Sequence, residues 1–408
     1  MSNSGASSAL LIHITGQDKP GLTHALTEIL AWYNVRILDI GQAVIHDGLA
    51  LGILVELTQE MRSSALLTEL LLTAHQLGVQ IKFSASSADE YDAWVSAQSK
   101  QRFIVTVLGP TIEAAHISKV SGILTEGGLN IDRIDRLSSR SPLTVPPEPT
   151  RFCVEFSTSG GVAVREDEVR TKLAALTEEA EIDIAFQHDS VFRRNRRLVA
   201  FDMDSTLIQG EVIDELAREA GVGEQVRAIT ESAMRGELDF QASFRRRVAL
   251  LKGLPEEALQ RVIERIPLTD GAERLVSTLK RLGYKTAILS GGFTFFGRVL
   301  QQRLGIDSLH ANTLAIAGGV VTGEVVDDVV DGARKAQLLQ DLARREGLSL
   351  EQVIAVGDGA NDLPMLRLAG LGIAFRAKPV VRANAKQALN SLGLDGILYL
   401  VGVRDREV

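Results

Sequence analysis

Two aspartates spaced two residues apart follow a short apolar run in the stretch LVAFDMDSTL, residues 198–207. Asp202 and Asp204 stand where a buried strand would end, and such a pair can supply a nucleophile and a proton carrier. A structural role is about as frequent as a catalytic one, because a lone DxD after a strand often forms only a turn or a helix cap. The chemistry therefore depends on which other groups the fold brings to the same place.

Further chemical groups follow apolar runs or begin helices in the same half of the chain. Ser290 follows the run YKTAIL, Asp358 and Asp362 follow QVIAVG, and Lys335 opens the predicted helix ARKAQLLQDLARR. Taken singly, they read as a helix N-cap, turn residues and a solvated lysine. Carboxylates gathered without a cation would repel one another. Together, these residues favour a phosphate pocket with a divalent cation among the acids.

The elements that must position these groups are parallel strands alternating with helices. The runs at 198–203, 284–292 and 352–359 are almost continuously apolar, as strands covered on both faces require. Ligands of a doubly wound sheet bind beyond the carboxyl ends of its strands, where these groups fall. Residues 211–266 show helical spacing, and residues 313–325 read as a β-hairpin turning at Gly318-Gly319. The predicted class is α/β, a doubly wound parallel sheet of Rossmann type with a helical cap.

The motifs FDMDST, ILSGG, Lys335 and GDGAND, in this order, resemble the four motifs of the haloacid-dehalogenase-like phosphatases. Within that superfamily, the inserted segment is similar to that of the phosphoserine phosphatases. The resemblance implies hydrolysis of O-phospho-L-serine, the last step of serine biosynthesis. It makes Asp202 the nucleophile that forms an aspartyl-phosphate, and Asp204 the acid and then the base. It also implies Mg²⁺ held by Asp202, the Asp204 backbone carbonyl and Asp358, with Asp362 in support.

The same resemblance assigns the residues that bind the phosphoryl group. Ser290, the Gly291 amide and Lys335 would hold its oxygens as charge shifts in the transition state. Asn361 would help to position the substrate.

The helical insertion would recognise the rest of the substrate. By resemblance, Arg247 binds the carboxylate, Glu211 meets the ammonium, and Met234 and Phe240 close over the chain. Read without the resemblance, Met234 and Phe240 are core residues. The run Arg245-Arg246-Arg247 is then a solvated helix face, and we keep that interpretation for the first two arginines.

The N-terminal half repeats itself, because ILAWYNVRILDI, residues 29–40, aligns with ILTEGGLNIDRI, residues 123–134. The loop at residues 16–30 resembles the ligand loop of ACT domains, which are α+β, ferredoxin-like modules that sense amino acids. The resemblance implies an L-serine effector site, with candidate residues from both copies: Asp18, Gly21, Gly109 and Asn130. A packing or dimerisation module without a ligand is the alternative.

These observations predict three domains: ACT-like units at 1–95 and 96–190, and a phosphatase domain at 191–408 with its cap at about 210–270. The segment VFRRNRRL, residues 191–198, marks the last joint. We predict its four arginines to be a solvated linker.

The composition limits the class of protein. The 408 residues are 45% hydrophobic and 24% charged, a composition typical of globular proteins. The net charge of −8 argues against a nucleic-acid partner. The single cysteine, Cys153, allows no disulfide within the chain. The first apolar run has no basic residue before it, and no run reaches about 18 apolar residues, so we expect neither a signal peptide nor a membrane span. We expect a cytoplasmic homodimer.

Two rival functions remain open at this point. One is another small-molecule phosphomonoesterase of the same fold, which Glu211 and Arg247 disfavour because a neutral or purely anionic substrate would not need both. The other is an amino-acid-sensing binding protein with a vestigial catalytic half. The intact set of acids, serine and lysine argues against that.

Overall fold

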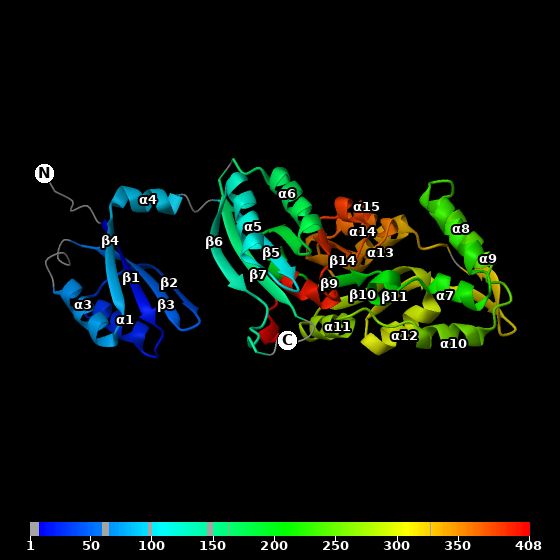
Figure 1. Ribbon diagram of the computed structural model, residues 1–408, viewed down its shortest axis with the longest axis horizontal. Coiled ribbons are helices and arrows are strands. Elements are labelled where there is room, and N and C mark those ends of the chain that lie inside the picture. Colours follow the sequence, from blue (N-terminus) through cyan, green and yellow to red (C-terminus); the bar gives the residue numbers. More distant parts are fainter. Residues whose placement is uncertain (1–7, 59–64, 97–99, 145–149, 162, 327) are drawn as a thin grey trace. The chain divides into compact units, whose positions relative to one another are not determined.

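The computed structural model describes residues 8–58, 65–96, 100–144, 150–161, 163–326 and 328–408, but not the side chain of Met234. The chain divides into two compact units, residues 1–100 and 101–408. The first unit contains one antiparallel sheet, and the second contains another together with a six-stranded parallel sheet (Figure 1). None of the described helices is long and apolar enough to cross a membrane.

The two antiparallel sheets share one βαββαβ arrangement, which confirms the predicted repeat. Their strand orders are β2-β3-β1-β4 and β6-β7-β5-β8. The first copy consists of β1 (Ser8–Gln17), α1 (Leu22–Trp32), β2 (Ile37–Ile45), β3 (Gly48–Leu57), α3 (Leu66–Leu77) and β4 (Gln80–Ser86), followed by α4 (Ala88–Ser96). The second consists of β5 (Gln101–Gly109), α5 (Ala114–Glu126), β6 (Leu129–Arg136), β7 (Phe152–Gly160), α6 (Glu166–Glu179) and β8 (Asp183–His188).

The parallel sheet has the strand order β11-β10-β9-β14-β15-β16. Its strands are β9 (Leu198–Phe201), β10 (Lys285–Phe293), β11 (Ser308–Asn312), β14 (Val353–Gly357), β15 (Leu371–Phe375) and β16 (Gln387–Leu389). The three apolar runs predicted as strands are β9, β10 and β14, and β9 lies between the other two. The carboxyl ends of these three strands therefore meet.

Helices cover both faces of this sheet, so the predicted doubly wound fold is confirmed. Val199 and Phe201 of β9 pack in one core with α11 (Ala272–Arg281) and α12 (Thr294–Leu304). Leu198 and Ala200, on the opposite face, pack with α13 (Gly332–Arg345) and α14 (Leu363–Leu368). Burying a Val, Leu, Ile, Phe or Met side chain stabilises the fold by about 1.5–3 kcal/mol. Burial on both faces therefore fixes the position of β9.

The insertion between β9 and α11 is helical, as predicted. It consists of α7 (Val212–Glu219), α8 (Gly223–Met234), α9 (Phe240–Ala249) and α10 (Glu256–Arg265). The predicted hairpin is also present, as β12 (Leu314–Ala317) and β13 (Val320–Val325). Within the second unit, Figure 1 shows the insertion helices at the end away from the antiparallel sheet.

The prediction of a solvated arginine linker is wrong for two of its four arginines. Arg193 is buried and forms an ion pair with Glu155 of β7. Arg196 is also buried and donates to the backbone carbonyl of Arg193 and to Oε1 of Gln187. Burial and the charge of Arg193 lower the pKa of Arg196 to about 10. The net acidity of the chain could not reveal these partners, two of which, Glu155 and Gln187, belong to the second antiparallel sheet.

The second antiparallel sheet is joined to the parallel sheet within one compact unit. Near their joint, the Gln387 side chain accepts from the Phe186 N–H at 3.0 Å and donates to the Phe186 carbonyl at 2.7 Å. The buried carboxylate of Asp183 accepts hydrogen bonds from Asn390 and Ser391. That residues 96–190 and 191–408 form two separate domains stays a prediction.

Candidate active site

Asp202 is held at the centre of the parallel sheet. Its backbone N–H donates to the carbonyl of Val356 in β14 at 2.8 Å. Its buried side chain accepts from the Met203 N–H through Oδ1 at 2.8 Å, and the same oxygen lies 2.8 Å from Nζ of Lys335. Bonds to rigid neighbours fix the carboxylate before any substrate arrives.

Asp204 lies in a short turn, Met203–Leu207, that follows β9 and is closed by a bond from the Ile208 N–H to the Met203 carbonyl at 3.1 Å. The turn requires Ser205 to adopt φ +55°, in the left-handed region that non-glycine residues rarely occupy. Oδ1 of Asp204 then accepts from the N–H of Val212, at the start of α7, at 3.0 Å. Asp202 and Asp204 line the same cavity.

The environment of Asp204 favours its protonated form. Burial raises the pKa of the Asp204 carboxyl well above its usual range, and the negative charges of Glu211 and Asp202 raise it further. The hydrogen bond from Val212 opposes this shift without cancelling it. A carboxyl that keeps its proton at neutral pH can act as a general acid.

Gly292 leaves the room that Asp204 needs. A Cβ atom on Gly292 would lie 2.4 Å from Oδ2 of Asp204 and 2.5 Å from Cε of Met203. Such distances are far inside van der Waals contact, so a larger residue would displace the acid or its neighbour.

The carboxylates of Asp358 and Asp362 lie close to that of Asp202, as the strand-end argument predicts. Oxygens of Asp202, Asp358 and Asp362 lie within 4.8 Å of one another. The fully buried Nζ of Lys335 lies 2.8 Å from Oδ1 of Asp202 and 2.7 Å from Oδ1 of Asp362. Burial alone would lower the pKa of Lys335, but the charges of Asp202 and Asp362 raise it above its usual value. The lysine is therefore an ammonium.

One ammonium does not neutralise three carboxylates. Burial and the charge of Asp202 raise the pKa of Asp358 to about 8 and that of Asp362 to about 6. An all-oxygen donor set with excess negative charge fits a hard divalent cation. Asp362 is engaged through both oxygens, since Oδ2 accepts from the Gly359 N–H at 2.9 Å, which suits the supporting role expected for it.

Ser290 and Gly291, which we predicted to bind the phosphoryl group, lie in the last part of β10. Ser290 is buried, and its Oγ accepts from the Gly292 N–H at 2.9 Å. Gly291 lines the cavity together with Asn361. A Cβ atom on Gly291 would lie 3.2 Å from the ring of Phe240, so the backbone passes close beneath the helical insertion.

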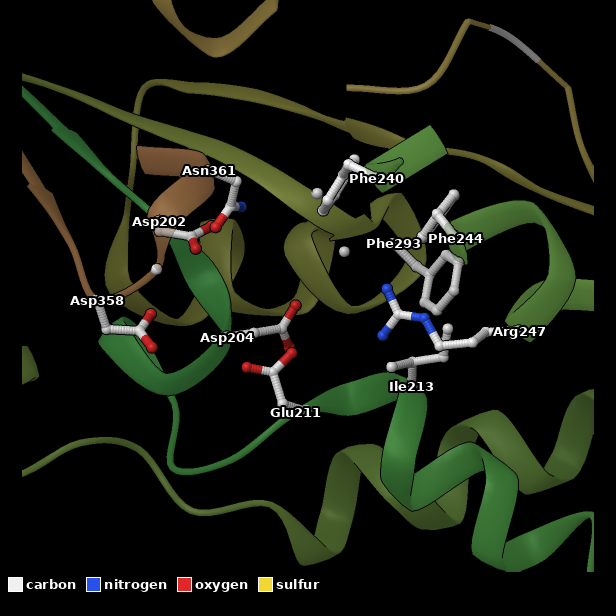
Figure 2. Close-up of a pocket in the computed structure, with 13 residues that line it drawn as sticks. Asp202, Asp204, Glu211, Ile213, Phe240, Phe244, Arg247, Phe293, Asp358 and Asn361 are labelled. Atoms are coloured by element: carbon white, nitrogen blue, oxygen red, sulfur yellow. The ribbon is translucent and has the colours of Figure 1, made fainter. Parts of the chain in front are cut away.

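A cavity of about 120 Å³ separates the acids from the insertion helices (Figure 2). It is lined by Asp202, Asp204, Glu211, Ile213, Phe240, Phe244, Arg247, Gly291, Gly292, Phe293, Asp358, Gly359 and Asn361. In Figure 2 the guanidinium of Arg247 points toward Asp204 and Glu211. The cavity thus joins the carboxylates to a cationic and an anionic group of the insertion.

Arg247 and Glu211 are both poised toward the cavity. Burial lowers the pKa of the Arg247 guanidinium, while Glu211 and Asp214 oppose this, and its Nε has no hydrogen-bond partner among the described residues. Glu211 accepts from Oγ of Ser205 at 3.1 Å, and burial followed by the charge of Asp202 raises its pKa. Glu211 lines the cavity and, as a residue, is exposed to solvent.

Comparisons with known proteins agree with this geometry. A family model described as haloacid dehalogenase-like hydrolase matches residues 196–370, and two ACT-domain models match residues 8–84 and 102–187. A phosphoserine phosphatase of Streptomyces coelicolor is 43% identical over 402 residues, which cover 98% of this chain and 93% of that protein. The chain belongs to the phosphoserine phosphatase family.

Other members of the phosphoserine phosphatase family show the same relationship. One from Mycobacterium tuberculosis is 40% identical over 401 residues, covering 98% of this chain and 94% of that protein. Among solved structures, a probable phosphoserine phosphatase from Vibrio cholerae has a TM-score of 0.57 and 38% identity, and covers 73% of this chain and 86% of that chain. A haloacid dehalogenase family hydrolase from Salmonella enterica has a TM-score of 0.63 and 34% identity, and covers 73% of this chain and 99% of that chain.

Most residues that we predicted for a phosphoserine phosphatase site lie at or beside the cavity. Ser290 and Lys335 are fully buried and are not among the lining residues. The Met234 side chain lies outside the described residues. The Asp204 side chain is not part of the acidic cluster, and its metal role through the backbone carbonyl stays a prediction. Arg245 and Arg246 are exposed.

The prediction missed Ile213, Phe244, Phe293, Gly292 and Gly359, which also line the cavity. Gly292 and Gly359 lie within the motifs ILSGG and GDGAND, and Phe244 carried a periodic signal in the sequence. Phe240, Phe244 and Arg247 follow at i, i+4 and i+7 and therefore share a face of α9. The others could be found only once the strand ends were placed in space.

The predicted effector residues belong to different compact units. Asp18 and Gly21 flank the start of α1, where Gly21 has φ +88°. In the second unit, Gly109 is buried at the end of β5, and Asn130 is exposed and donates to Asp132. Their role in binding an effector stays a prediction.

The raised pKa values make the stability of the metal-free protein depend on pH. Asp358 and Asp362 bind protons in the folded chain up to pH values of about 8 and about 6, whereas an unfolded aspartate releases its proton at about pH 4. The free energy of unfolding should therefore fall as the pH rises from about 5 to about 8. Mg²⁺ competes with these protons, so it should raise the melting temperature more at about pH 8 than at about pH 5.5.

Calorimetry of the protein stripped with a chelator, before and after addition of Mg²⁺, measures this difference. Asp358→Asn should lose most of the Mg²⁺-dependent stabilisation. The matched control Asp341→Asn changes a half-exposed acid that pairs with Arg344 and should keep it. An equal Mg²⁺ shift at both pH values would contradict a cation site built from these carboxylates.

Proposed function

We propose that the protein hydrolyses O-phospho-L-serine to L-serine and phosphate, in the last step of serine biosynthesis, through an aspartyl-phosphate on Asp202. The observation that carries this proposal is the single cavity that joins Asp202 and Asp204 to Glu211 and Arg247. Phosphoserine presents a phosphate, a carboxylate and an ammonium, and the cavity offers a counterpart for each. The relatives from Streptomyces coelicolor and Mycobacterium tuberculosis carry the corresponding name.

In the first step, the Asp202 carboxylate attacks phosphorus and the bond from phosphorus to the serine oxygen breaks. Asp204, protonated in its buried environment, gives its proton to that leaving oxygen. In the second step, Asp204 takes a proton from water as the water oxygen attacks phosphorus and releases phosphate from Asp202. The two steps restore both aspartates.

Ser290, the Gly291 N–H and Lys335 would hold the phosphoryl oxygens while their charge changes. Asp202, Asp358 and the Asp204 carbonyl, supported by Asp362, would hold Mg²⁺. The bound cation would shield the nucleophile from the negative phosphate.

Recognition of the amino-acid end falls to the insertion. The two N–H edges of Arg247 match a carboxylate, and Glu211 can accept the ammonium. Phe240, which lies against Gly291, together with Met234 would cover the bound chain, and Asn361 would position it. Closing this cover excludes water until the aspartyl-phosphate has formed.

Phosphate release from phosphoserine in the presence of Mg²⁺ tests the proposed activity. We expect turnover that disappears on removal of the cation. A protein that hydrolyses other phosphomonoesters but leaves phosphoserine intact would contradict the proposal.

Arg247→Ala should lower kcat/KM for phosphoserine by about 100-fold, or about 2.7 kcal/mol, because it removes a charge-assisted pair with the substrate carboxylate. The same change should lower kcat/KM for p-nitrophenyl phosphate by less than about threefold, because that substrate lacks the carboxylate. Arg246→Ala, which alters the exposed neighbour, is the matched control and should leave both substrates unaffected. Equal losses on both substrates would remove Arg247 from substrate recognition.

We further propose that L-serine regulates the enzyme through the ACT domains, with Asp18 and Gly21 at the ligand loop. L-serine also binds as a product, so the informative rate is the one at saturating phosphoserine, where competition disappears. There L-serine should still change phosphate release, and Asp18→Ala should abolish the change while Asp92→Ala on α4 retains it. An effect that is absent at saturation, or unchanged in Asp18→Ala, would refute regulation at this loop.

A further inference from the structure

The residues that bind the phosphoryl group lie where β10 leaves its partner strand. In the parallel pairing of β10 with β11, Leu289 is opposite His310 and Phe293 is opposite Asn312. Ser290, Gly291 and Gly292 therefore face the single residue Ala311, and the loop bulges out of the sheet. A bulge frees the backbone from the ladder, and something else must fix its orientation.

The side chain of Asn312 supplies that fixation. Its Nδ2 donates to the carbonyl of Gly291 at 2.7 Å, and its Oδ1 accepts from the N–H of Val330 at 2.8 Å. The residue is 2% exposed. Only this orientation of the amide gives each bond a donor and an acceptor, so Asn312 is satisfied at both ends.

The bond to Gly291 also orients Ser290. In a trans peptide the C=O and the following N–H point in opposite directions. With the Gly291 carbonyl held by Asn312, the Gly292 N–H is directed to Oγ of Ser290, 2.9 Å away. Because Oγ accepts this bond, the hydroxyl proton of Ser290 remains available for a phosphoryl oxygen.

The bond to Val330 fixes the start of α13. The next residue, Asp331, caps that helix by accepting from the Arg334 N–H at 2.9 Å, and its carbonyl accepts from the Lys335 N–H at 2.9 Å. Asn312 holds Val330, and Lys335 lies one helical turn after the next residue, Asp331. The position of Lys335 therefore depends on the bond between Asn312 and Val330. One buried amide ties together two chain segments that approach the same phosphoryl group.

We propose that Asn312 is a positioning residue that orients the Ser290 hydroxyl and the Lys335 ammonium toward the same phosphoryl group. This inference rests on the proposed phosphatase function and deepens it. Asn312 acts at the phosphoryl end, which phosphomonoesters share, whereas Arg247 acts at the amino-acid end.

Asn312→Ala should therefore lower kcat for phosphoserine and for p-nitrophenyl phosphate by the same factor, about 100-fold, similar to the loss of a transition-state donor. Thr313→Ala is the matched control at the adjacent position, where the hydroxyl accepts from the Thr294 hydroxyl, and it should stay within about threefold of the wild type. Circular dichroism confirms folding, and kcat is expressed per folded molecule.

Asn312→Asp keeps the shape of the side chain and provides a second readout. The protonated acid can donate to Gly291 and accept from Val330, whereas the carboxylate faces the Gly291 carbonyl and repels it. The ratio of its kcat to that of the wild type should rise as the pH falls from about 8 to about 5.5. Taking the ratio cancels the titrations that both proteins share, such as those of His310, Asp204 and Asp358. The alanine variant should show no such rise.

The outcomes separate the two proposals. Wild-type protein that spares phosphoserine but hydrolyses p-nitrophenyl phosphate contradicts the proposed substrate and leaves the Asn312 test intact on the second ester. Loss confined to phosphoserine, or kcat of Asn312→Ala within about threefold of the wild type, overturns the positioning role. So does a kcat ratio for Asn312→Asp that stays flat with pH.

Discussion

The site depends on the buried ammonium of Lys335, which lies between the carboxylates of Asp202 and Asp362. Burying charges is costly unless they are paired, and removing one partner of a buried pair costs about 3–5 kcal/mol. The lysine therefore links the segments that follow β9 and β14. The carboxyl of Asp358 is a third acid in the cluster, beyond the two that pair with the lysine. That excess of negative charge fits the divalent cation that we propose for this site.

Two aspartates two residues apart have different surroundings, which suit the different roles that we propose for them. Asp202 is paired with Lys335 at the end of a central strand. Asp204 is buried, and burial together with the negative charges of Glu211 and Asp202 raises the pKa of its carboxyl. The mechanism that we propose needs an ionised nucleophile and a protonated general acid, and the turn Met203–Leu207 gives the two carboxyl groups different surroundings.

Much of the catalytic half could be predicted from the sequence, because it depends on local patterns. Apolar runs without alternation indicate strands covered on both faces, and chemical residues directly after those runs must meet at the carboxyl edge. Features that depend on distant segments could not be predicted. Arg193 is buried because Glu155 of another sheet pairs with it, and the need for Gly292 arises from the approach of Asp204. The bulge held by Asn312 leaves no periodic signal in the sequence.

The most direct test of the central claim is the chemical state of Asp202 during turnover. We would mix the protein with phosphoserine and Mg²⁺, quench it in acid within one turnover, and locate the added phosphoryl group by peptide mass spectrometry. We predict a transient phosphoryl group on Asp202 that decays as phosphate appears and is absent from Asp202→Asn. A phosphoryl group on any other residue, or turnover by Asp202→Asn at the wild-type rate, would contradict the proposed chemistry.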